Sequence, residues 1–183
     1  MPPNAKMLMR ELRDDHRNMA IVLDVLADVI QEAAAGNDPD FELVDEIMRY
    51  MTVYPDAVHH PKEDIVYRQL RRERPDLADG LEDVPADHDA IAELGTALRD
   101  DVEAIIAGGA VRREKLVGDM SDYVDRLRRH MNWEEGDLFK RIDSMLASDD
   151  RNVDIAQYEH IRDPIFELEI ESGFQRLMSS LQR

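Results

Sequence analysis

Apolar residues recur along this chain at spacings of three and four, the period of one face of an α-helix. Alternation with the period of a β-strand persists nowhere in the sequence. Pro55 and Pro61 lie inside the second helical stripe and predict a kink or a short break there, and Pro164 is expected to bend the last one. The predicted helical segments cover residues 6–35, 40–72, 85–107, 111–146 and 153–181.

Short connectors separate the first four segments, and glycines stand at two of the expected ends, at Gly36 and at Gly108-Gly109. Four helices with short connections favour an all-α fold, an up-down-up-down four-helix bundle. The last segment is then an additional C-terminal helix. We therefore expect a bundle over residues 1–147 and a C-terminal helical extension over 148–183 that packs on it.

The composition excludes several kinds of binding partner and metal site. The 183 residues include 41 acidic and 23 basic side chains, a net charge of −18, which argues against binding nucleic acid or an anionic membrane surface. Cysteine is absent, so disulfides and thiolate-based metal sites are excluded. No apolar run approaches the roughly 18 residues of a membrane span, and none resembles a signal peptide. We expect a soluble, cytoplasmic protein.

Histidines interrupt the inward stripes of the first four segments, one in each: His16, His59, His88 and His130. Two of them precede a glutamate by four residues, which pairs His59 with Glu63 and His130 with Glu134. Residues four apart lie on the same face of a helix, so each imidazole and its carboxylate can reach one metal or two neighbouring metals. In an up-down-up-down bundle all four groups approach the same level of the core.

Buried carboxylates cost several kcal/mol each unless they are paired or bound to a metal. A purely structural histidine–glutamate network would satisfy them with protons. Four imidazoles and two carboxylates also suit iron, zinc, manganese or copper, and the lack of thiolates favours iron or manganese. Two metals that share the carboxylates use this number of ligands better than one.

In this order, the set His, His-x-x-x-Glu, His, His-x-x-x-Glu resembles the hemerythrin-like family, the HHE cation-binding domain. The similar residues are Asp15-His16, the stretch 59–64, Asp87-His88 and the stretch 130–135, within residues 8–146. The resemblance implies a four-helix bundle that holds two iron ions joined by an oxo or hydroxo bridge. It implies bridging carboxylates and terminal histidine ligands at Glu63, Glu134, His16, His59, His88 and His130.

One departure from the oxygen-carrying hemerythrins stands out. They place a second histidine four residues from the one in the third helix, where this chain has Val84 and Ala92. One iron therefore lacks an imidazole, unless another side chain takes the place: His60, Glu135, Tyr54 or Tyr123. We expect His60, about 100° round the helix from His59, to face solvent or to support a ligand from outside.

This departure disfavours simple oxygen carriage. The first hypothesis is a non-haem di-iron protein that binds O2, peroxide or NO, with a catalase-like or NO-directed redox role or an oxygen- or iron-responsive one; whether it turns substrate over stays open. A second hypothesis is an iron- or oxygen-sensing or iron-handling module whose C-terminal helix binds a partner. A third is a metal-free helical interaction domain. A homodimer stays open as the oligomeric state.

Overall fold

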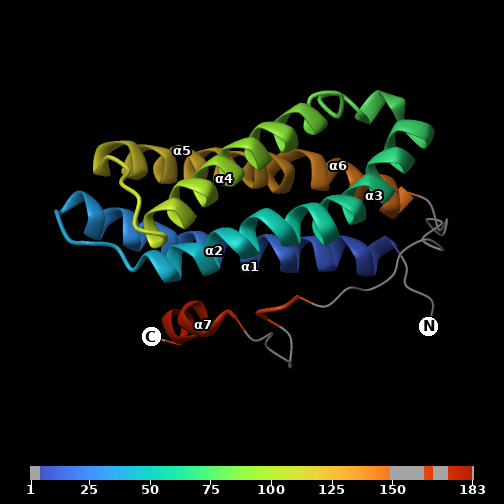
Figure 1. Ribbon diagram of the computed structural model, residues 1–183. Helices are drawn as coiled ribbons and strands as arrows, with labels where there is room; N and C mark the ends of the chain where they lie inside the picture. Colours follow the sequence, from blue (N-terminus) through green and yellow to red (C-terminus); the bar gives the residue numbers. More distant parts are fainter. Residues whose placement is uncertain (1–4, 149–162, 167–172, 183) are drawn as a thin grey trace.

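The computed structural model describes residues 5–148, 163–166 and 173–182, and every regular element in this part of the chain is a helix (Figure 1). Residues 5–148 form four rods, two of which change helix type along their length. Their elements are α1 (Ala5–Ala34); α2 (Phe41–Tyr54), η1 (Pro55–His59) and α3 (His60–Glu73); α4 (Val84–Ile106); and α5 (Arg113–Trp133), η3 (Glu134–Leu138) and α6 (Phe139–Ser148). The short 3-10 helix η2 (Pro75–Leu77) joins the second rod to the third.

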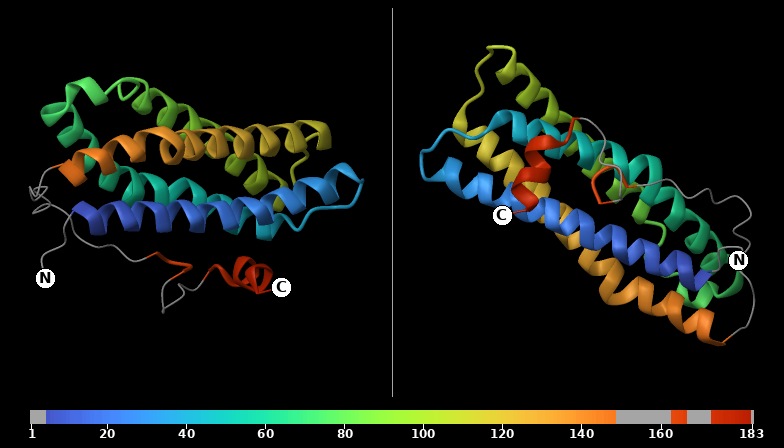
Figure 2. Two further views of the ribbon diagram at one scale, coloured as in Figure 1. Left: turned by 180° about the vertical axis from the view of Figure 1, so that it is seen from behind. Right: turned by 90° about the horizontal axis from the view of Figure 1, so that it is seen from below.

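The four rods lie alongside one another as a closed ring of neighbours, because α1 contacts α2 and α5, and α4 contacts α2 and α5 (Figures 1 and 2). Gly95 allows a close approach inside this ring, since a Cβ at its position would lie 3.0 Å from both Thr52 and Tyr123. The all-helical prediction is thus confirmed for the described residues. None of their helices combines the length and the apolar character that crossing a membrane requires.

Local chemistry explains where these helices begin and end. The Asp40 carboxylate accepts a hydrogen bond from the backbone N–H of Leu43 at 3.1 Å and so caps the start of α2. Gly36 and Gly108 have φ values of +95° and +89°, a conformation that glycine adopts without steric cost just after α1 and α4. The first, third and fourth predicted segments agree with the observed helices to within two residues at each end.

The break predicted around Pro55 and Pro61 takes the form of a π-helical turn, and the rod continues through it. In η1 the backbone N–H of His60 donates to the carbonyl of Pro55, five residues earlier. The fourth rod contains the same feature, which the sequence did not predict: in η3 the N–H of Phe139 donates to the carbonyl of Glu134. Such turns interrupt α-helices frequently at functional sites, and each of these two contains a candidate metal ligand.

The apolar core consists of two clusters, and each rod contributes to both. The larger cluster includes Met19, Val58, Ile91 and Leu127. The smaller cluster includes Leu12, Val66, Val84 and Leu138. On every rod the candidate ligands fall between these two positions in sequence. The six residues therefore form a polar layer enclosed by apolar packing above and below.

The C-terminal helix predicted over 153–181 is helical, among the described residues, only in α7 (Gln175–Leu181). Residues 163–166 form a turn, so the prediction of a helix there is wrong. The reason is local: Pro164 has no N–H for a helix, and the Asp163 carboxylate accepts hydrogen bonds from the N–H groups of Ile165 and Phe166. The rest of the prediction, and His160, lie outside the described residues.

Both described C-terminal pieces pack on the first two rods. Figure 2 shows α7 beside α1 and α2, which it contacts. Ile165, Phe174 and Leu177 are buried in the larger core cluster. Asp163 is buried as well, and its carboxylate accepts a hydrogen bond from the Tyr50 hydroxyl at 2.9 Å. This part of the C-terminal region is therefore integrated into the core.

Candidate metal centre

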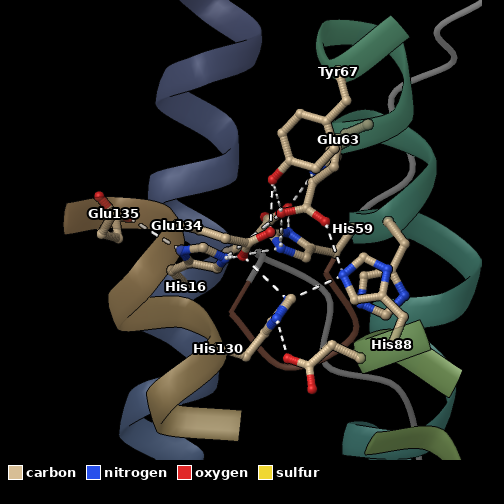
Figure 3. A network of polar contacts seen from close by, with 12 residues as sticks. His16, His59, Glu63, Tyr67, His88, His130, Glu134 and Glu135 are labelled. Carbon is tan, nitrogen blue, oxygen red and sulfur yellow. Dashed lines mark hydrogen bonds and ion pairs between the residues drawn. The ribbon is translucent and has the colours of Figure 1, made fainter. Parts of the chain in front are cut away.

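The polar layer brings together all six side chains proposed as metal ligands, from all four rods (Figure 3). One group of ligand atoms within 4.8 Å of one another comes from His16, His59, Glu63 and Glu134. A second group comes from His88, His130 and Glu134. Two adjacent sets of potential metal ligands thus share the Glu134 carboxylate.

The first set has two imidazoles whose Nε2 atoms point toward each other. His16 Nε2 lies 3.0 Å from His59 Nε2, on α1 and η1 respectively. His59 Nε2 lies 3.2 Å from Glu63 Oε1, and His16 Nε2 lies 3.4 Å from Glu134 Oε2. All four side chains are buried. Each glutamate therefore reaches this pair from a different rod.

The second set repeats the arrangement. His88 Nε2 lies 3.0 Å from His130 Nε2, on α4 and α5. His130 Nε2 lies 3.3 Å from Glu134 Oε2, and His88 Nε2 lies 3.5 Å from Glu63 Oε2. Both glutamates consequently face both imidazole pairs, Glu63 with one oxygen on each side and Glu134 with the same oxygen on both. Both glutamates are therefore placed where one carboxylate can reach both imidazole pairs.

Carboxylates outside the cluster set the orientation of three imidazoles. Asp15 Oδ2 lies 3.2 Å from His59 Nδ1, and Asp87 Oδ2 lies 2.9 Å from His130 Nδ1. Glu135 Oε1 lies 3.2 Å from the Nδ1 atom of His16. A carboxylate at Nδ1 places the ring proton there and leaves the Nε2 lone pair free to bind a metal. The supporting carboxylates therefore present Nε2 of these rings toward the cluster.

Asp15 is itself held in a buried network. Lys62 Nζ donates to its Oδ2 at 2.7 Å, and the Tyr54 hydroxyl donates to its Oδ1 at 3.0 Å. Burial on its own would raise the pKa of Asp15, but the hydrogen bond and charge of His59 and the charge of Lys62 lower it below its ordinary value. Asp15 therefore stays ionised as the partner of the His59 ring.

Tyr67 connects the two glutamates, and the sequence analysis missed it. Its hydroxyl lies 2.7 Å from Glu134 Oε1 and 3.0 Å from Glu63 Oε1. Burial, followed by the two negative charges, raises the pKa of Tyr67 well above its ordinary value, so the hydroxyl keeps its proton and donates it. A signal was available in the sequence, because Tyr67 follows Glu63 by four residues on the same helix face.

Two buried carboxylate oxygens in the layer accept no hydrogen bond from the described residues: Glu63 Oε2 and Glu134 Oε2. These are the oxygens that lie 3.5 Å from His88 Nε2 and 3.3 Å from His130 Nε2. A buried oxygen without a donor costs roughly 1–3 kcal/mol, and more when it is charged. Cations between the imidazoles and these oxygens would satisfy both. The residues present therefore fit a pair of metal ions.

The pKa values of the layer also indicate that its carboxylates favour positive charge beside them. Burial lowers the pKa of His59, but Glu63 and Asp15 outweigh it and raise the pKa to about 10. Burial raises the pKa of Glu63, but His59 and the other imidazoles outweigh it and lower the pKa to about 2. A proton on His59 thus supplies charge that a metal ion would supply, so protons and metal compete for the cluster.

The four candidates for the remaining ligand position differ in the residues that they contact. Glu135 contacts His16 Nδ1, Tyr54 donates to Asp15, and Tyr123 donates to the Met51 carbonyl at 3.3 Å. Of the histidine and the carboxylate among these candidates, His60 and Glu135, His60 lies in a group of potential ligand atoms, with Glu63 and His88. Of the two expectations for His60, facing solvent or supporting a ligand from outside, the first does not hold, because its side chain is only 17% exposed and its ring stacks on that of His88.

A cavity of about 430 Å³ reaches the layer from outside, between the start of α4 and the end of α5. Val84 and Trp133 form part of its apolar wall, and His130 and Asp87 line its inner side. Arg126 lines it too, and its Nη2 donates to Asp87 Oδ1 at 2.5 Å. A small molecule in this cavity would therefore lie beside His130, one imidazole of the second pair.

Comparison with known families agrees with this geometry. The family model of the hemerythrin HHE cation-binding domain matches residues 7–142, which includes all six candidate ligands. The chain therefore belongs to the hemerythrin HHE cation-binding family. Neither a curated protein nor a solved structure matches the chain significantly. The family and the cluster together support a cation-binding protein.

Proposed function

We propose that this protein is a non-haem di-iron protein that binds O2, peroxide or NO at two iron ions. In this proposal the four rods form an up-down-up-down bundle. His16 and His59 bind one iron, His88 and His130 bind the other, and the carboxylates of Glu63 and Glu134 bridge them. An oxo or hydroxo group completes the bridge. The iron pair supplies two-electron redox chemistry toward a small oxygen or nitrogen species.

One observation carries the proposal: both Glu63 and Glu134 lie between the two imidazole pairs, and each has a buried oxygen that accepts no hydrogen bond from the described residues. In both pairs the two Nε2 atoms lie 3.0 Å apart, so a single proton can serve each pair and these two oxygens remain without a donor among the described residues. Cations relieve both features at once.

The protein's own side chains have three tasks. Asp15, Asp87 and Glu135 hold the imidazoles in the binding orientation from Nδ1. Tyr67 holds Oε1 of Glu134 and Oε1 of Glu63 with its hydroxyl group. The apolar clusters on either side restrict water, and the cavity beside His130 gives a small ligand a way in.

The test is anaerobic loading of the purified chain with Fe(II), followed by removal of free metal and determination of iron per chain. We expect about two irons in the wild-type protein. Glu63→Gln, which keeps the shape but weakens a bridging ligand, should lower the content of both irons. Glu73→Gln is the matched control, because this glutamate lies on the same helix outside the layer. Equal iron in the wild type and in Glu63→Gln would contradict the bridging role.

A second candidate function, metal sensing, is favoured by a specific chain of contacts. Asp163 accepts a hydrogen bond from Tyr50, whose ring stacks on Tyr54 with centroids 5.3 Å apart. Tyr54 donates to Asp15 at 3.0 Å, and Asp15 contacts His59 Nδ1 at 3.2 Å. The buried C-terminal turn is thus connected to a proposed iron ligand through side chains alone. We propose that iron at His59 stabilises this turn.

Hydrogen exchange measured by mass spectrometry tests the sensing role. The N–H groups of Ile165 and Phe166 are protected by Asp163, so exchange in their peptide reports whether the turn is docked. The sensing proposal predicts slower exchange in the iron-loaded protein than in the chelated one, and loss of this difference in Tyr50→Phe. The same exchange rate with and without iron would contradict the sensing proposal, but it would not affect the proposed binding function.

A further inference from the structure

The two halves of the proposed iron site are unequal. Each has two imidazoles and access to both glutamates, but potential ligand atoms from a third imidazole, His60, lie only on the side of His88. Within the described residues, no comparable group adds a third imidazole beside His16 and His59. The missing histidine of the third helix is thus matched by a surplus histidine on the second rod.

From this we infer that His60 is a third imidazole ligand of the iron held by His88 and His130. The inference rests on the proposed di-iron function. A ligand atom of His60 lies within 4.8 Å of ligand atoms of Glu63 and His88. The His60 ring stacks on the His88 ring with centroids 3.7 Å apart and planes 12° apart, so both rings approach the cluster from the same side.

The π-helical turn explains how two consecutive histidines can both reach the layer. In an α-helix successive side chains are about 100° apart, which would turn His60 away when His59 points inward. The turn η1 ends at His59 and closes with an i→i+5 hydrogen bond from His60 to Pro55. More residues per turn mean a smaller angle between neighbours, which keeps both imidazoles on the inner side.

The second ring nitrogen of His60 has the partner expected for a metal ligand. Its Nδ1 lies 3.1 Å from Oδ1 of Asp56, one turn earlier on the same rod. Asp56 is thus the charge partner of His60 at Nδ1, on the ring position where Asp15 and Asp87 hydrogen-bond to His59 and His130. With the proton on Nδ1, the Nε2 lone pair of His60 is free to bind a cation.

Two variants separate ligation from packing. His60→Phe keeps an aromatic ring against His88 but offers no ligand nitrogen, whereas His60→Ala leaves a space that free imidazole can enter. Asp64→Asn is the control, because its side chain is 69% exposed on the same helix. The readout is equilibrium titration with Fe(II), and in parallel with Co(II), of the full chain, with far-UV circular dichroism to confirm folding.

We expect wild type and Asp64→Asn to bind two metal ions. His60→Phe should bind the first with unchanged affinity and the second about 100-fold more weakly, at or beyond the upper end of what loss of a supporting residue costs. Millimolar imidazole should restore the second ion in His60→Ala and leave His60→Phe unchanged. This rescue is not expected if His60 only packs.

Three results would overturn the inference. Wild-type affinity for both ions in His60→Phe would make His60 a packing residue. Equal weakening of both ions would mean that His60 supports the whole layer rather than one metal. Fewer than two ions in the wild type would remove the di-iron function and this inference with it, so failure of the two is distinguishable.

Discussion

Tyr67→Phe tests the interpretation of the polar layer with the smallest change available. It removes the one hydroxyl that reaches both glutamates and leaves the aromatic ring in the core. The hydroxyl lies 2.7 Å from Glu134 Oε1 and 3.0 Å from Glu63 Oε1, and the residue is 4% exposed. Since one O–H has one proton, the change removes the equivalent of one hydrogen bond to a carboxylate.

A hydrogen bond to a charged group contributes roughly 1.5–3 kcal/mol to stability. The unfolding equilibrium of the metal-free protein should therefore shift by about 10- to 100-fold. For a chain of this size the midpoint of thermal unfolding should fall by about 3–12 °C. Iron affinity should also fall, by about 10- to 100-fold, because Tyr67 contacts both carboxylates that we propose as bridges.

Tyr123→Phe is the matched control. Tyr123 is buried like Tyr67, but its hydroxyl donates to a neutral acceptor, the Met51 carbonyl, at 3.3 Å. The loss should be about 0.5–1.5 kcal/mol, with iron affinity unchanged. Urea unfolding of the chelated proteins, analysed at constant denaturant slope, gives the difference. Equal destabilisation of the two variants, with equal iron affinity, would refute the assigned role of Tyr67.

Three further changes probe the layer and the C-terminal turn. Glu134→Ala, which removes a carboxylate shared by both halves, should lose most bound iron, whereas Glu135→Ala should weaken binding about 10- to 100-fold. The pKa of His59, lowered by burial but raised to about 10 by its carboxylate partners, means that iron displaces a proton at neutral pH. Iron affinity should therefore rise with pH from the neutral range upward, as His59 loses its proton more readily. Asp163→Ala leaves the Tyr50 hydroxyl without this acceptor and should destabilise the protein by roughly 1–3 kcal/mol.

Each of these predictions has a result that contradicts it. Two irons per chain in Glu134→Ala would contradict the assignment of Glu134 as an iron ligand. Proton release on iron uptake can be measured by calorimetry in buffers of different ionisation enthalpy. Iron uptake without proton release would mean that His59 is already neutral. An unfolding midpoint in Asp163→Ala equal to that of Asp79→Ala, in the exposed loop before α4, would show that the C-terminal turn adds nothing to the stability of the bundle.

Much of the fold could be predicted because its elements are long amphipathic helices, two of which are followed by glycines. The π-helical turns could not, since a pattern of apolar residues three and four apart contains no sign of an i→i+5 turn. Pro55 and Pro61 indicated that something interrupts the second rod, while nothing comparable marks Glu134 on the fourth. The helix expected across Pro164 fails because the Asp163 side chain competes for the backbone N–H groups.

The six candidate ligands could be found because each histidine and glutamate lies on an otherwise apolar stripe. Their supporting residues are harder to predict, because they act across rods. Asp15 precedes His16 in sequence but contacts His59, and Asp87 precedes His88 but contacts His130. Sequence spacing gives the neighbours of a residue on its own helix, whereas the partner on another helix depends on how the rods are packed.

The central claim is that Glu63 and Glu134 bridge two iron ions, and metal content tests it most directly. Iron per chain should be determined on freshly purified, Fe(II)-reconstituted protein, with an absorption spectrum recorded alongside. The account predicts about two irons per chain and ligand-to-metal bands of a bridged ferric pair after exposure to air. A single metal ion, or none after reconstitution, would contradict it and leave a helical bundle with a histidine–glutamate network.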